Sequence, residues 1–146
     1  MAVYNKFNPF VEHLVSKVHD LLGASAADMD AINLYLSNAP PDAAADAVKA
    51  DLAEISTGNG YTAGGTSIAP ISGTRTTGTY TFAATDKVWT ASGGAIAQFR
   101  YVVLFNNTPS SPLDPLIAWW DYGSAVDVGA GETFTVDFGA QVFTLA

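Results

Sequence analysis

The sequence predicts a mainly β protein: an antiparallel β-sandwich or jelly-roll-like barrel with an N-terminal arm and a short amphipathic helix. Two runs, Gln98–Asn106 and Leu116–Tyr122, carry apolar side chains at both alternating positions. Because successive side chains of a strand point to opposite faces, such runs are typical of strands buried on both faces. The Asn-, Ser- and Pro-rich stretch between them favours a loop. We therefore expect the two runs to pair as antiparallel strands at the centre of the fold.

Shorter apolar runs separated by turn residues continue through the chain from residue 66 onward. They predict strands at Thr66–Ile71, Thr76–Ala83, Lys87–Thr90, Ile96–Asn106, Leu116–Tyr122, Ala125–Val128, Thr133–Phe138 and Gln141–Leu145. This rhythm favours a sandwich or jelly roll over an α/β fold. In the longest run, strict alternation places Phe99, Tyr101, Val103 and Phe105 on one face and Arg100, Val102 and Leu104 on the other.

The N-terminal part predicts an extended arm over residues 1–7, followed by a helix. Asn8 suits an N-cap and Pro9 the first helical position. Apolar residues then recur at helical spacing, and Gly23 is a natural stop. We expect an amphipathic helix over Asn8–Leu22.

The segment before residue 66 predicts mixed structure. Ala24–Asp28 is expected to be a linker, and Ile32–Ser37 alternates in the manner of a half-buried strand. The Ala-rich Asp42–Ser56 fits either a helix or a loop leading to a short strand. Gly58–Gly65 predicts a turn. The 146 residues suit a single domain, with arm and helix in 1–23, this mixed segment in 24–65 and a β-domain in 66–146.

Composition and charge exclude several functional classes. Cysteine is absent, which rules out disulfides, thiolate metal sites and a Cys nucleophile. The net charge is −8 with no basic patch, so we expect no nucleic-acid ligand. No apolar run approaches the ~20 residues of a membrane span, and the N-terminus lacks the pattern of a signal peptide. Charged residues make up only 14 %, which fits either a surface that faces another protein or a polar β surface rich in Ser, Thr and Asn.

No catalytic, cofactor or metal site is expected. His13 and His19 would lie about 240° apart on the predicted helix, so they could not share a ligand, and we expect both on the solvated surface. Gly58–Gly65 lacks the ending of a phosphate loop, and Asp28–Asp30 lacks the glycine and glutamate of a calcium loop. Nothing in the spacing of the aspartates predicts a catalytic pair. We therefore expect that the protein is not an enzyme.

Trp119 and Trp120 are adjacent in a predicted strand, so one indole must face the core and the other outward or toward a second layer. An exposed indole could anchor a partner protein or stack on a sugar. Burial of both, one on each face of an inner strand, is the interpretation we favour.

Several motifs together resemble small virion structural proteins of tailed bacteriophages, over nearly the full length. They are Met1–Phe7 followed by Phe10–His19, then Leu34–Pro40, Glu54–Ile55 before Gly58–Gly65, Trp89–Gly94, Phe99–Leu104, Pro115–Gly123 and Gly131–Phe134. The resemblance implies a capsid decoration (cement) protein on the capsid exterior, assembled in the bacterial host cytoplasm. Its implied partner is the major capsid protein, and it implies a homo-oligomer, with a trimer as one form. A tail, baseplate or receptor-binding protein, and a host carbohydrate-binding domain, remain alternatives.

In this interpretation the arm, the helix and the tryptophans supply the partner contacts. The candidate contact residues are Val3, Tyr4, Phe7, Phe10, Val11, Leu14, Trp119 and Trp120. A terminal segment can lie along a neighbour or add a strand to its sheet. Alternatively, the helix simply closes the open end of the barrel.

Overall fold

The computed structural model describes residues 2–23 and 27–146 and confirms a mainly β fold with antiparallel sheets and one short α-helix. Its elements are β1 (Val3–Lys6), α1 (Pro9–Val15), β2 (Ile32–Ser37), a 3-10 helix (Lys49–Asp51), β3 (Thr66–Ser67), β4 (Ile71–Thr76), β5 (Thr79–Ala84), β6 (Lys87–Thr90), β7 (Ile96–Asn106), β8 (Leu116–Val128), β9 (Thr133–Val136) and β10 (Phe143–Leu145). Within the described part, no helix is long and apolar enough to cross a membrane.

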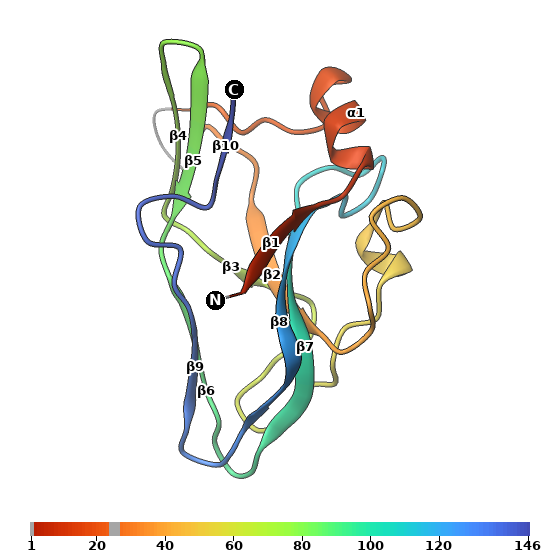
Figure 1. Ribbon diagram of the computed structural model, residues 1–146, viewed down its shortest axis with the longest axis vertical. Helices are drawn as coiled ribbons and strands as arrows, with labels where there is room; N and C mark the ends of the chain where they lie inside the picture. The colour runs from red at the N-terminus through yellow and green to blue at the C-terminus, as the bar shows by residue number, and fades with distance from the viewer. Residues whose placement is uncertain (1, 24–26) are drawn as a thin grey trace.

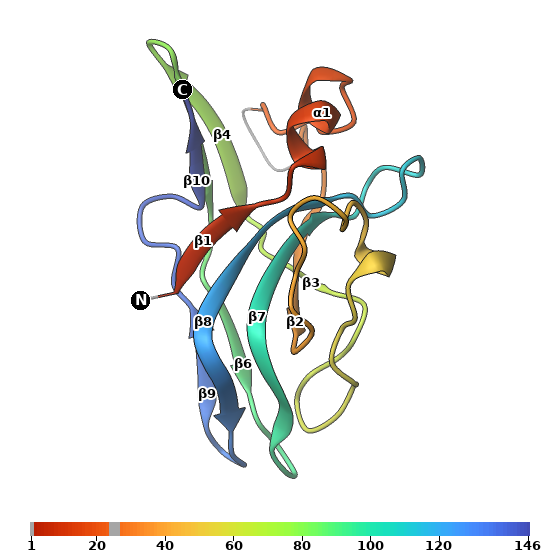
Figure 2. The same cartoon turned by 45° about the vertical axis from the view of Figure 1, so that its right-hand side comes forward.

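Two layers of strands form a β-sandwich. One layer is a five-stranded sheet in the order β1-β8-β7-β2-β3, and Figure 2 shows β1, β8, β7 and β2 side by side with β1 outermost. The other layer contains two small sheets, β10-β5-β4 and β6-β9, which lie one above the other in Figure 1. β1 and β2 come from the first 65 residues, yet both belong to the same sheet as β7 and β8. The predicted segments 1–23, 24–65 and 66–146 therefore share one central sheet.

The predicted antiparallel pairing of the two long apolar runs is confirmed. β7 and β8 pair with Val102 opposite Trp120 and Leu104 opposite Ala118. β8 is longer than expected, because it continues through Gly123, whose φ of 81° only glycine adopts readily, and absorbs the predicted strand at 125–128.

A β-bulge changes the face on which Phe99 lies. The register of β7 against β8 shifts on both sides of Phe99, and an extra residue in one strand reverses the alternation locally. Phe99 consequently packs with Val102 and Leu104, whereas Tyr101 and Val103 belong to the opposite face. The expectation that Phe99 shares a face with Tyr101 was wrong.

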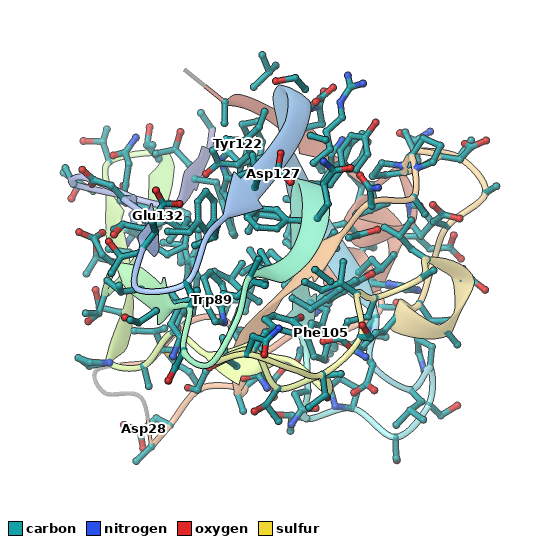
Figure 3. All side chains as sticks on the ribbon, turned by 90° about the horizontal axis from the view of Figure 1, so that it is seen from below. Asp28, Trp89, Phe105, Tyr122, Asp127 and Glu132 are labelled. Atoms are coloured by element: carbon teal, nitrogen blue, oxygen red, sulfur yellow. The ribbon has the colours of Figure 1, made fainter. Side chains whose placement is uncertain are left out.

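Two hydrophobic clusters lie on the two faces of the five-stranded sheet. The main core lies between the layers and includes Phe10, Leu34, Phe82, Trp89, Phe99 and Leu104. The outer core covers the other face and consists of Phe7, Tyr35, Leu52, Tyr101, Val103, Phe105, Leu116 and Trp119. Figure 3 shows Trp89 and Phe105 on different sides of β7, one in each core. β2 contributes side chains to both cores, so it is buried on both faces and is not the half-buried strand expected.

The outer core is covered by the segment 38–65, which runs along the right-hand side of Figure 1. No α-helix forms in Asp42–Ser56, where the structure has turns, the 3-10 helix and an isolated bridge between Val48 and Pro115. The Asp42 carboxylate accepts the backbone N–H groups of Ala44 and Ala45, and Asp51 likewise accepts two backbone N–H groups. Such side-chain bonds stabilise turns in competition with a helix, so the loop alternative was the better one.

The helix α1 ends seven residues earlier than predicted. Lys17 adopts a left-handed conformation with φ of 62°. The Val18 N–H donates to His13 O at 2.9 Å and the Lys17 N–H to Leu14 O at 3.3 Å, the pattern of a Schellman helix end. The Asn8 side chain makes no capping hydrogen bond, while Pro9 does occupy the first turn. The chain therefore reverses at Lys17, and Gly23 has no part in ending the helix.

Several strand bounds also differ. The predicted strand Thr66–Ile71 is divided between β3 and the start of β4, and a tight turn at Thr77–Gly78 separates β4 from β5 where one strand over Thr76–Ala83 was expected. β9 and β10 are shorter than predicted. Most of the expected linker Ala24–Asp28 lies outside the described residues.

Candidate functional site

Strand β1 forms an edge of the five-stranded sheet, and its register places Tyr4 opposite Trp120 and Lys6 opposite Ala118. Val3 is 61 % exposed and Tyr4 38 % exposed. An edge strand offers backbone N–H and C=O groups to an incoming strand. The predicted arm is thus part of the sheet, and it presents its outer edge for pairing.

Three candidate contact residues lie inside the protein. Phe7 and Phe10 are fully buried and Trp119 is nearly so. The Phe7 and Trp119 rings are 4.5 Å apart in the outer core, and Phe10 meets Phe143 in the main core. Their side chains hold the arm and helix against the sandwich. Because a large apolar group buried in a core is out of reach of a partner, we do not expect these three residues to contact one directly.

The adjacent tryptophans point to opposite faces, as alternation requires. Trp119 is buried in the outer core, and Trp120 is half-buried and turned toward the second layer, with Tyr4 at 5.6 Å and Phe138 at 5.7 Å from its ring. The expectation that both indoles are buried is therefore confirmed for Trp119 and wrong for Trp120, which retains an accessible part.

A cleft of about 300 Å³ lies beside Trp120, where β8 faces β9 and the β9–β10 connection. We call it the edge cleft. Its lining combines aromatic and polar side chains, among them Trp120, Tyr122, Thr135, Asp137, Phe138 and Gln141. Tyr122, on β8 in Figure 3, packs its ring edge-to-face on Phe134. The aromatic walls and the carboxylate and amide at its rim suit a ligand that is part apolar and part hydroxylated.

A second exposed apolar surface lies on the side of α1 that faces away from the main core. Val11 is 46 % exposed, Val15 82 % and Leu22 63 %. Beside them, a groove of about 210 Å³ is lined by Leu14, Leu22 and Leu145 among others. We call these five residues the end patch. Figure 1 shows that α1 lies at the same end of the molecule as the β4–β5 turn. The helix therefore covers the main core through Phe10 and also exposes an apolar face.

The two histidines lie together, against expectation. Because the chain reverses after α1, the His13 and His19 rings stand edge-to-face with centroids 5.7 Å apart, and His19 is buried. The pKa of His19 is lowered to about 4, because burial and, to a lesser extent, the positive charge of His13 disfavour the proton and outweigh the opposing Asp30 carboxylate. The expectation that both histidines are solvated was wrong for His19, since it relied on a helix that continued to Leu22.

Sequence reasoning missed a second polar cluster, centred on Glu54. Its carboxylate accepts hydrogen bonds from Lys49 Nζ and the Tyr61 hydroxyl, both at 2.6 Å, and from the backbone of Gly64 at 3.0 Å. Gly65 lies against the Phe105 ring so closely that a Cβ there would come within 2.6 Å of it. The sequence signal was an acidic residue placed before a glycine-rich turn that also contains a tyrosine.

Two acidic side chains of β8, Asp121 and Asp127, each bind a side chain of β7. Asp121 holds Arg100 through two hydrogen bonds of 2.7 and 2.8 Å, and Asp127 accepts from Gln98 at 3.0 Å. Across residues 2–23 and 27–146, no three His, Cys, Asp or Glu side chains are placed to hold a metal ion. What the geometry offers is surfaces for binding: the β1 edge, the edge cleft and the end patch.

Comparison of the chain with protein-family models, with curated proteins and with solved structures finds no match.

Proposed function

We propose that the protein is a capsid decoration protein of a tailed bacteriophage, which binds the major capsid protein on the exterior of the head. The proposal rests on the resemblance of its motifs to virion structural proteins. The observation in its favour is that β1 is an edge strand, two of whose side chains, Val3 and Tyr4, are exposed. A capsid subunit, or a second copy in a symmetric homo-oligomer such as a trimer, could add a strand at this edge.

The interface must extend beyond the four residues of β1. A stable interface buries about 800 Å² on each partner, more than one short strand can provide. The end patch is the natural extension, because the chain passes directly from β1 into α1, and Val11 and Val15 lie one turn apart on the exposed side of that helix. In this arrangement the protein stabilises the head by adding buried area between capsid subunits.

The first test is composition. Quantitative mass spectrometry of purified particles should find a ratio to the major capsid protein near one-to-one, on the order of hundreds of copies for an icosahedral head. A ratio of a few per cent would move the protein to the tail or baseplate. Absence from the particle would refute the virion assignment.

The second test concerns the edge. Purified protein is added back to heads that lack it, using Val3→Asp and a matched control, Val88→Asp, on β6. Both valines are exposed strand residues, 61 % and 50 %, but Val88 lies in the other layer. Binding lost in the first variant alone supports the β1 edge, and equal binding of both variants excludes it.

The edge cleft favours a second candidate function, contact with a carbohydrate receptor by a tail or baseplate protein. Sugar rings stack on aromatic side chains while their hydroxyls bond to carboxylates and amides, and Trp120, Tyr122, Asp137 and Gln141 supply these groups. A glycan panel read by tryptophan fluorescence tests it. Binding that Gln141→Ala weakens at least tenfold supports the function, and a panel without binding excludes it.

A further inference from the structure

The chain between α1 and β2 folds back onto the sandwich so that His19 lies in a buried corner. Its ring is 5.2 Å from the Phe10 ring and 5.7 Å from the His13 ring. On the remaining side it meets Asn106, the last residue of β7, whose Nδ2 is 3.0 Å from His19 Nδ1. Asn106 is itself buried.

The hydrogen bonds of Asn106 determine which way its amide points. Its Oδ1 accepts the Thr108 N–H at 3.0 Å, and its Nδ2 donates to Asp30 Oδ2 at 2.6 Å. Nδ2 is therefore the atom that faces His19, and it can only donate. His19 Nδ1 must accept, so it carries no proton, and the proton of the neutral ring sits on Nε2.

A second proton on His19 would have no acceptor. Nδ1–H would point at the donor group of Asn106, and reversing that amide would break its bonds to Asp30 and Thr108. His19 Nε2 and His13 Nδ1 are buried and have no hydrogen-bond partner among the described residues, so no hydrogen bond on this side of the ring would stabilise its charged form. A buried charge that lacks hydrogen-bond acceptors is unfavourable.

We propose that His19, Asn106 and Asp30 form an acid-sensitive latch, in which protonation of His19 breaks the contact with Asn106 and releases residues 17–23 from the sandwich. The proposal does not depend on the function proposed above.

Some of the charged and titratable groups around His19 lower its pKa and others raise it. His13, from α1, repels a proton on His19, and Asp30, which precedes β2, attracts it. Asp20 is tied to Asp30 through its backbone N–H at 2.7 Å. Tyr80, from β5, donates its hydroxyl to Leu21 O. Burial together with His13 outweighs Asp30, so the folded state disfavours the proton.

The sign of the pH effect follows from this balance. The pKa of His19 is about 4 in the folded protein and near 6.5 when the ring is free. The open state therefore binds more protons between these values, and the latch is fully closed only above about pH 6.5. Lowering the pH from 7 to 5 should raise the opening equilibrium about 20-fold.

The state of the ring is tested first, on the intact wild-type chain. Imidazole ¹⁵N chemical shifts at pH 5 should report a neutral His19 with its proton on Nε2, where an ordinary histidine would be mostly protonated. A His19 that is protonated at pH 5, or that carries its proton on Nδ1, would overturn the proposal without any variant.

Amide hydrogen exchange then measures opening. The Asp20 N–H donates to Asp30 Oδ2 and the Asp30 N–H donates to Asp20 O. After correction for intrinsic exchange rates, the protection of these two amides should fall about 20-fold from pH 7 to 5. Protection of Val103 in β7 should not change. Equal loss at all three positions, or none, would refute a local latch.

Two variants separate the roles of the histidines. His19→Asn retains an acceptor at the position of Nδ1 but cannot be protonated, so protection of Asp20 and Asp30 should become independent of pH. His13→Asn removes the charge that lowers the pKa of His19, so the 20-fold loss should become smaller. An undiminished loss in His19→Asn would exclude His19 as the group that titrates.

Discussion

The Tyr61 hydroxyl donates to the Glu54 carboxylate at 2.6 Å and accepts the Leu36 N–H at 3.0 Å. This one hydroxyl therefore joins the segment that covers the outer core to the backbone of β2. Lys49 completes the cluster, since its ammonium bonds to Glu54 and lies 5.1 Å from the centre of the Tyr35 ring. The covering segment is held by polar bonds as well as by the burial of Leu52.

Replacing Glu54 by glutamine should destabilise the protein by roughly 1–3 kcal/mol, because Lys49 loses its counter-charge and the bonds from Tyr61 and Gly64 weaken. Urea denaturation measures the change. Glu12→Gln on the exposed side of α1 is the control, and it should stay within about 0.5 kcal/mol. Equal effects of the two variants would show that the cluster contributes nothing beyond a surface charge.

The same cluster predicts a loss of stability in acid. Burial alone would raise the pKa of Glu54, but hydrogen bonds from Lys49, Tyr61 and Gly64 outweigh it and lower the pKa below the ordinary value of 4.5. Its contribution is complete above that value and is lost as the pH falls through the lower folded pKa. Denaturation at pH 5 and pH 3.5 should show a steeper decline in wild type than in Glu54→Gln. Parallel declines would contradict the prediction.

The bulge in β7 predicts which aromatic residues act together. Phe99→Ala should cost about 3–5 kcal/mol, since Phe99 is fully buried and meets Phe134 edge-to-face at 4.7 Å. A double-mutant cycle with Phe134 should give a coupling of about 0.5–1.5 kcal/mol. A cycle with Phe105, on the other face of the sheet, should give none. Coupling to Phe105 instead would place Phe99 in the outer core.

We expect substitutions in the buried part of the arm to destabilise the protein and substitutions in its exposed part to have little effect. Phe7→Ala should cost about 3–5 kcal/mol, because it leaves a cavity beside Trp119. Val3→Ala should change stability by less than about 0.5 kcal/mol, since Val3 is 61 % exposed. Thermal denaturation compares the two. If both variants behave alike, the arm does not dock as described.

Lys17→Gly should stabilise the protein by about 0.5–1 kcal/mol. Lys17 ends α1 with φ of 62°, a conformation that costs other residues about 1–2 kcal/mol, partly offset by the greater chain entropy of glycine. Ser16→Gly, one residue earlier and with φ of −84°, should instead destabilise. A destabilised Lys17→Gly would mean that the helix end is shaped differently.

Local sequence patterns located the central strands, but they did not predict features that depend on contacts with residues distant in the sequence. Alternation identified Ile96–Asn106 and Lys87–Thr90 with the bounds that the structure shows, and it separated Trp119 from Trp120. The face of Phe99 depends on a register shift against β8, which no pattern within β7 records.

The same limit applies to the candidate site. Lys17 carries no marker of a left-handed residue, so the helix was extended past it and His19 was assigned to the surface. Asp42 and Asp51 bond to the backbone and prevent the helix that the alanines between them favour. The end of α1 and the covering segment are therefore the parts that only the folded chain defines.

The pairing of β1 with β8 also orders events during synthesis. Lys6 pairs with Ala118, so β1 cannot pair in the sheet until β8, far later in the chain, has been made. Contacts this distant in sequence form late, after the neighbouring β7 and β8 have met. Until then the nascent chain exposes Phe7, and its protection from other chains depends on how quickly β8 follows.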